Sequence, residues 1–275
     1  MAAVTAKITK DRQKYLERIT PYKAIIQTIL GVEENELLLI KKDSPGAALK
    51  RLALTEEMLN LTAYYIILGD ISQSMLKERN EEDLNEGQKS LFKAVMYLED
   101  VVSPLVDVPF SEYAERLAGI STVDTLKRYT LIKKMGLTLE LLENACGDDN
   151  KWKWTFVELE GRFAAVAKNI INLKTVVANK NPDSSDYEPT MYYLSLIKKL
   201  LPHAAERYHE KYESCGNHID DLKTAIHFLN ALRRIHTHIG ERENAEALKK
   251  KAESWMVKLE IDSEKQKKTV FTPGS

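Results

Sequence analysis

The stretch that decides the fold of this 275-residue chain is residues 44–77, SPGAALKRLALTEEMLNLTAYYIILGDISQSMLK. Its apolar residues recur at intervals of three and four, which is the period of an α-helix rather than of a strand. Ser44 followed by Pro45 is typical of a helix start, because serine caps the first turn and proline fits the first helical position. The apolar residues lie around much of the helix. We therefore expect a helix on the order of 50 Å long that is buried on more than one side.

The rest of the chain has the same character. Gly (11) and Pro (8) are scarce, and long stretches are rich in Leu, Ala, Lys and Glu, the residues that favour helices. Strand patterns are nearly absent. The sequence therefore predicts an all-α fold of eight or nine mostly antiparallel helices, arranged as a bundle or an irregular solenoid-like array.

Local signals predict where several helices begin and end. Thr20 with Pro21 indicates a new helix start, so we expect separate helices over 8–18 and 22–30, the second closed by Gly31. One helix is expected from about residue 152 to 177. A later one starts near residue 188 and must kink or break at Pro202.

Charge and histidine content indicate two parts. Residues 1–150 hold 19 basic and 24 acidic residues, whereas 151–275 hold 21 and 17 and all six histidines. We predict an N-terminal helical part, 1–150, and a C-terminal helical part, 151–262, which one continuous domain would also explain. Residues 263–275, SEKQKKTVFTPGS, are typical of a disordered tail.

Composition and missing motifs exclude several classes of protein. Net charge is −1, which gives no general attraction to nucleic acid or anionic membranes. The longest apolar run, 63–68, is far short of the roughly 20 residues of a membrane span. Two cysteines without a leader segment favour free thiols and a cytoplasmic location. Phosphate loops, zinc motifs and nucleophile elbows are missing, so we predict no cofactor and no metal site. Glu206-x-x-His209 is the nearest metal signal, but such sites use two copies.

Residues 219–239 carry the best candidate for a binding surface. Ile226, Leu229, Leu232, Ile235 and Ile239 mark the core side of this expected helix. His236 falls among them and is expected to be a core histidine with one hydrogen-bond partner. The predicted partner-binding residues are the cations of the opposite side, Lys223, His227, Arg234 and His238. They form a cationic stripe that could receive an acidic partner or a phosphate, or simply face water.

Two resemblances fall in the same region. Arg233, four residues and His238 resemble the active-site motif of HEPN-type helical ribonucleases. That resemblance implies that Arg233 stabilises an RNA phosphate and that His238 transfers a proton, usually across a dimer. On a straight helix, however, residues five apart point about 140° away from each other.

Residues 226–259 also resemble a single tetratricopeptide hairpin, with Leu229, Leu232, Gly240, Ala245 and Ala252 at its apolar or small positions. One repeat is not stable alone as a solenoid, and no motif identifies a family for the whole chain. The sequence favours a non-enzymatic cytoplasmic protein that binds a protein partner or itself. A ribonuclease or RNA-binding protein using Arg233 and His238 is the alternative, and nucleic acid is the less favoured partner.

Overall fold

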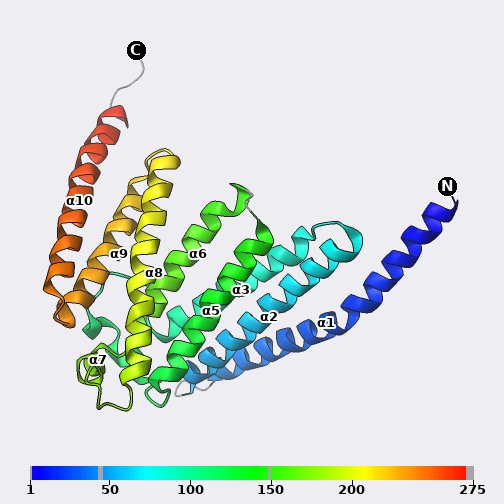
Figure 1. The fold of residues 1–275 in the computed structure, drawn as a ribbon, viewed down its shortest axis with the longest axis horizontal. Coiled ribbons are helices and arrows are strands. Elements are labelled where there is room, and N and C mark those ends of the chain that lie inside the picture. Colours follow the sequence, from blue (N-terminus) through cyan, green and yellow to red (C-terminus); the bar gives the residue numbers. More distant parts are fainter. Residues whose placement is uncertain (1, 43–45, 148–149, 271–275) are drawn as a thin grey trace. The chain divides into compact units, whose positions relative to one another are not determined.

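The computed structural model describes residues 2–42, 46–147 and 150–270, and this part of the chain is all-α, with no strand. Ten α-helices, slightly more than the eight or nine expected, and one short 3-10 helix make up most of this part of the chain (Figure 1). The all-α prediction is confirmed. The helices are α1 (Ala2–Lys42), α2 (Ala47–Leu76), α3 (Glu81–Val101), η1 (Phe110–Glu112), α4 (Ala114–Ala118), α5 (Thr125–Cys146), α6 (Asn150–Asn169), α7 (Leu173–Asn179), α8 (Tyr187–Ser214), α9 (Ile219–His238) and α10 (Arg242–Val270).

The chain divides into two compact units. Unit 1 is formed by residues 1–101, 119–121 and 130–152, and unit 2 by residues 102–118, 122–129 and 153–275, as far as they are described. The predicted division into an N-terminal part, 1–150, and a C-terminal part, 151–262, stays a prediction.

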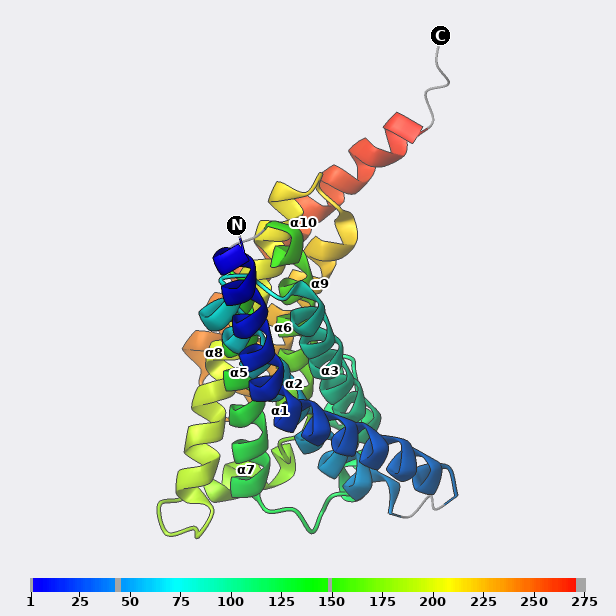
Figure 2. The same cartoon turned by 90° about the vertical axis from the view of Figure 1, so that its right-hand side faces the viewer.

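The expected break at Thr20–Pro21 is wrong, because α1 runs without interruption through Pro21 and Gly31. Pro21 removes only one hydrogen bond of the helix, and the Thr20 hydroxyl donates to the Leu16 carbonyl at 2.7 Å. α1 bends instead of ending (Figures 1 and 2), and a proline inside a helix is the usual cause of such a bend. The predicted start at Ser44–Pro45 lies outside the described residues.

Unit 1 is built around α2, which packs between α1 and α3. As its sequence predicts, α2 is buried on more than one side, by residues such as Leu54, Met58 and Leu68. Gly87 of α3 permits close packing, since a Cβ there would meet Tyr65 and Leu142 at 3.3 Å. The Asn80 side chain caps α3 by accepting from the Asp83 amide at 3.2 Å.

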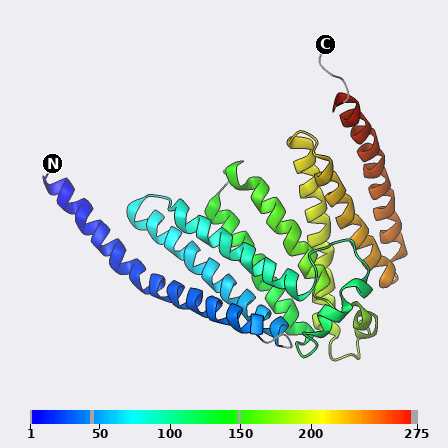
Figure 3. The same ribbon diagram turned by 180° about the vertical axis from the view of Figure 1, so that it is seen from behind.

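Unit 2 contains α8, α9 and α10, which pack in sequence as neighbouring helices (Figures 1 and 3). α8 continues through Pro202, so the expected helix break does not occur there. The helix expected over 152–177 is interrupted: α6 ends at Asn169, and Asn172 caps α7 by accepting from the Lys174 amide at 3.1 Å. This cap competes with continuation of the helix.

The C-terminal end departs from the predicted tail. α10 continues to Val270, so residues 263–270 are helical, and 271–275 lie outside the described residues. Ion pairs one turn apart, such as Lys265 with Asp262 at 2.9 Å, favour this extension.

Candidate functional site

α9 and the turn that follows it form the frame of the candidate site. Asp220 and Asp221 in the first turn and His236 and His238 in the last turn match the dipole of the helix. Gly240 then takes a left-handed conformation, with φ of 83°. The Glu241 amide bonds back to the His236 carbonyl at 2.8 Å, so α10 can start at once.

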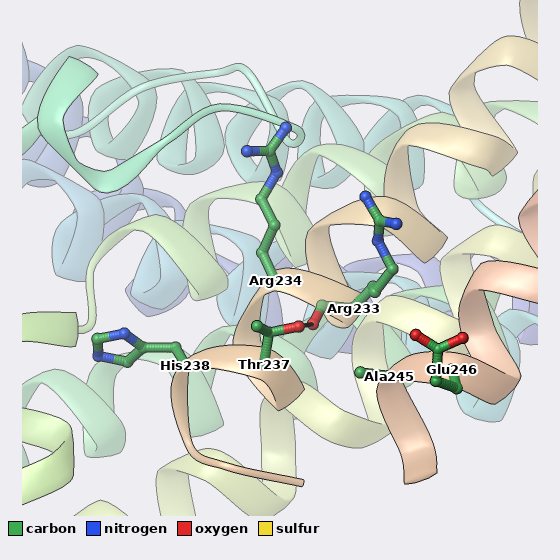
Figure 4. A pocket seen from close by; sticks show the side chains of 6 residues that line it. All are labelled: Arg233, Arg234, Thr237, His238, Ala245 and Glu246. Carbon is green, nitrogen blue, oxygen red and sulfur yellow. Dashed lines mark hydrogen bonds between the residues drawn. The ribbon is translucent and has the colours of Figure 1, made fainter. Parts of the chain in front are cut away.

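An open pocket lies on the surface of this α9–α10 hairpin and has a volume of about 490 Å³. Six residues line it: Arg233, Arg234, Thr237, His238, Ala245 and Glu246. Figure 4 shows Arg233 and Arg234 extending in the same general direction, while the ring of His238 points away from both. Two guanidinium groups therefore line the pocket, but the arginines and His238 do not form a joined pair.

The four predicted partner-binding residues have contacts within the chain. Lys223 pairs with Asp220 of its own helix at 2.9 Å. Arg234 and His227 both reach the carboxylate of Asp107, at 2.8 and 3.6 Å. The Nε2 atom of His238 lies 2.7 Å from the Leu173 carbonyl. All four side chains are exposed, so the cationic stripe faces water while three of its members also contact residues outside α9.

Asp107 is the anionic centre of this arrangement. Burial by itself raises the pKa of its carboxyl, but nearby His227 and the hydrogen-bonded guanidinium of Arg234 outweigh burial and lower the pKa below its usual value. Sequence reasoning missed Asp107, because it lies 127 residues from Arg234 along the chain.

The segment around Asp107 is also held by two buried residues of α6. Lys168, which is 2% exposed, donates to the Val106 carbonyl at 2.8 Å and lies over the Tyr113 ring at 5.1 Å. Asn169 donates to the carbonyls of Ser103 and Leu105 at 2.8 and 2.9 Å. We define residues 102–113 as the latch segment. Two polar residues inside the apolar run 163–171 were the signal that could have revealed this anchor.

The two residues of the ribonuclease alternative, Arg233 and His238, differ in their contacts within the chain. His238 is committed to the Leu173 carbonyl. Arg233 is half-buried, and its guanidinium has no ion pair or hydrogen bond with any described residue. Within one chain, the pair of groups that the HEPN-like motif requires is not brought together.

His236 is buried, as predicted, and its Nδ1 atom lies 2.6 Å from Glu241. Glu241 also binds Lys198 at 2.6 Å and Asn244 at 3.2 Å. Burial raises the pKa of Glu241, but these three hydrogen bonds prevail and lower it to about 2. The cluster fixes the turn between α9 and α10, and so the shape of the pocket.

The Glu206–His209 pair is occupied by other contacts. Glu206 binds Lys251 of α10, and the His209 ring stacks on Trp255 with centroids 4.4 Å apart. No group of three His, Cys, Asp or Glu side chains that could hold a metal ion occurs in the described parts of the chain. No helix in those parts is long and apolar enough to cross a membrane.

The model of the TP0443 family matches residues 11–263, so a family covers nearly the whole chain although no motif had indicated one. No curated protein matches, and no solved structure matches either.

Proposed function

The chain belongs to the TP0443 family, and we propose that it is a non-enzymatic, cytoplasmic interaction protein whose α9–α10 pocket binds an acidic segment of a partner protein. One observation carries the proposal: Arg233 stands in that pocket as a half-buried cation with no carboxylate of its own. The two free cysteines, Cys146 and Cys215, fit a reducing compartment.

The neighbours of Arg233 explain why it is the residue left for a partner. Arg234 is bound to Asp107 at 2.8 Å, and Glu246, which lines the same pocket, lies 4.0 Å from Lys249. A planar guanidinium can bind a carboxylate through two parallel hydrogen bonds. The small side chains of Thr237 and Ala245 leave room for an incoming Asp or Glu.

A binding titration tests the proposal. The probe is a fluorescein-labelled oligoglutamate peptide, followed by anisotropy at low and at physiological salt. Arg233→Gln should weaken binding roughly tenfold or more, since a charge-assisted hydrogen bond contributes about 1.5–3 kcal/mol. The matched control is Lys223→Gln, because Lys223 lies on the same helix but already pairs with Asp220. Equal losses in both variants, or no binding at all, would contradict the proposal.

The ribonuclease alternative is tested on the same preparations with a fluorogenic RNA. If the wild-type chain cleaves this RNA and both Arg233→Ala and His238→Ala abolish the cleavage, the ribonuclease alternative would be favoured instead. Its difficulty is that the Nε2 atom of His238 is hydrogen-bonded to the Leu173 carbonyl, which leaves only the Nδ1 atom for proton transfer at a phosphate.

A further inference from the structure

The α9–α10 pocket carries charges of both signs, one sign from each helix. Arg233 of α9 and Glu246 of α10 both line it. Figure 4 shows the guanidinium group of Arg233 and the carboxylate of Glu246 extending to the same side of the hairpin. No ion pair or hydrogen bond joins these two side chains. The pocket therefore presents a separate cation and a separate anion to whatever enters it.

Glu246 is held only loosely by its own helix. Among the described residues, its one ion pair is with Lys249, one turn further along α10, at 4.0 Å. The Glu246 side chain is 66% exposed in that pair. Exposed ion pairs of this kind contribute little to stability. Glu246 can therefore exchange Lys249 for a positive group of a ligand at small cost.

The other polar side chains of the pocket have closer contacts within the chain. Arg234, Thr237 and His238 each form a hydrogen bond with another residue, at 2.8, 2.9 and 2.7 Å. A ligand that used them would compete with these bonds. Arg233 and Glu246 are thus the two charged groups that a ligand can reach without displacing a short contact.

Glu246 also discriminates between anionic ligands. A run of acidic residues bound to Arg233 brings further negative charge toward Glu246, and so does a doubly charged phosphate. Like charges brought together in a binding site oppose association and exclude unsuitable partners. A ligand that carries a positive group beside its carboxylate replaces this repulsion by an attraction.

We propose that the α9–α10 pocket binds a partner segment in which an acidic residue stands next to a basic one. The carboxylate of that segment binds Arg233, and its positive group binds Glu246. This inference rests on the proposed function and names the chemistry of the partner more closely. It makes Glu246 the residue that determines specificity, while Arg233 provides the affinity.

Two fluorescein-labelled peptides test this inference by anisotropy. One alternates Glu and Lys, and the other alternates Glu and Ser, so the acidic residues have the same spacing in both. At low salt the wild-type chain should bind the Glu–Lys peptide roughly threefold more tightly, the size expected for an exposed ion pair. The preference should shrink at physiological salt, because exposed charges are screened.

Variants of α10 identify the residue responsible. Glu246→Gln should abolish the preference, and Glu246→Lys should reverse it in favour of the Glu–Ser peptide. The matched control is Glu253→Lys, because Glu253 is exposed on the same helix two turns later and does not line the pocket. This control should keep the preference of the wild type. Circular dichroism checks that each variant retains its helices.

The outcomes separate this inference from the function on which it rests. Suppose that the Glu–Ser peptide binds and that Arg233→Gln weakens it. Equal affinity of the wild type for both peptides, or a preference that survives in Glu246→Lys, would then overturn the inference and leave the proposed function intact. An equal change in Glu253→Lys and Glu246→Lys would do the same. If neither peptide binds, or if Arg233→Gln weakens neither, the proposed function fails and this inference fails with it.

Discussion

Lys168 permits a prediction whose size follows from the structure. The side chain is 2% exposed and its ammonium group rests against the Val106 carbonyl. Burial lowers its pKa from the usual 10.5 to about 8, although Asp107 acts in the opposite direction. Folding therefore disfavours the charged form. Between pH 8 and 10.5 the unfolded chain binds more protons than the folded chain, so stability should rise with pH across this window.

The magnitude comes from the two pKa values. Raising the pH from about 7 to 9.5 should remove about 2 kcal/mol of the destabilisation that charged Lys168 imposes. The same rise should be missing in Lys168→Met, which keeps the volume of the side chain but does not titrate.

Urea unfolding at a series of pH values measures the effect. The quantity to compare is the slope of the unfolding free energy against pH in the two proteins, since other groups titrate in both. Lysine labelled with ¹³C at Cε gives an independent reading, because one resonance should titrate near pH 8 and vanish in the variant. Parallel stability curves together with a Lys168 resonance that titrates near 10.5 would refute the reasoning.

Four further outcomes are expected. Gly161→Ala should destabilise the protein by about 1–2 kcal/mol in urea unfolding, because the new Cβ would lie 2.5 Å from the buried Tyr208 ring; Gly31→Ala, where a Cβ meets nothing, should stabilise it by up to about 1 kcal/mol. The folded pKa of Glu241 is about 2, so its stabilising charge is lost as pH falls from about 4.5 to 2. Glu241→Gln should therefore make the unfolding free energy depend less on pH across that window. Acid titrations that coincide for the two proteins would argue against this. Asp107→Asn should lower the thermal midpoint and tighten oligoglutamate binding, because His227 and Arg234 lose their shared carboxylate; unchanged peptide affinity would show that these cations do not contribute.

The sequence was sufficient for the fold class and for the face that α9 buries. Apolar residues recur every three and four positions, and glycine and proline are scarce, in nearly every segment. The fold-class prediction therefore does not depend on the interpretation of any single position. Helix ends were harder. Thr20–Pro21 resembles a helix start locally, but the apolar face of α1 continues from Ile19 to Ile26 across it. Packing of that face on α2 therefore outweighs the one hydrogen bond that proline removes.

The site was harder to predict than the fold, because a polar helix face has the same pattern whether it meets water or another part of the chain. Spacing placed His227, Arg234 and His238 together, and they do share one side of α9. It could not indicate that Asp107 and the Leu173 carbonyl are what they contact. The contact with Asp107 depends on the latch segment, which Lys168 and Asn169 hold by hydrogen bonds to its carbonyls.

The latch segment also bears on what the pocket binds. Asp107 shows that α9 binds a carboxylate through Arg234 and His227, two residues seven positions apart on one side of the helix. Arg233 precedes Arg234 by one residue and lines the pocket beside Ala245 and Glu246 of α10. The chain thus supplies its own carboxylate to Arg234 and His227, and supplies none of the described carboxylates to Arg233. Since a half-buried guanidinium gains most from an anion that excludes water, an acidic side chain from outside is the ligand that this asymmetry favours.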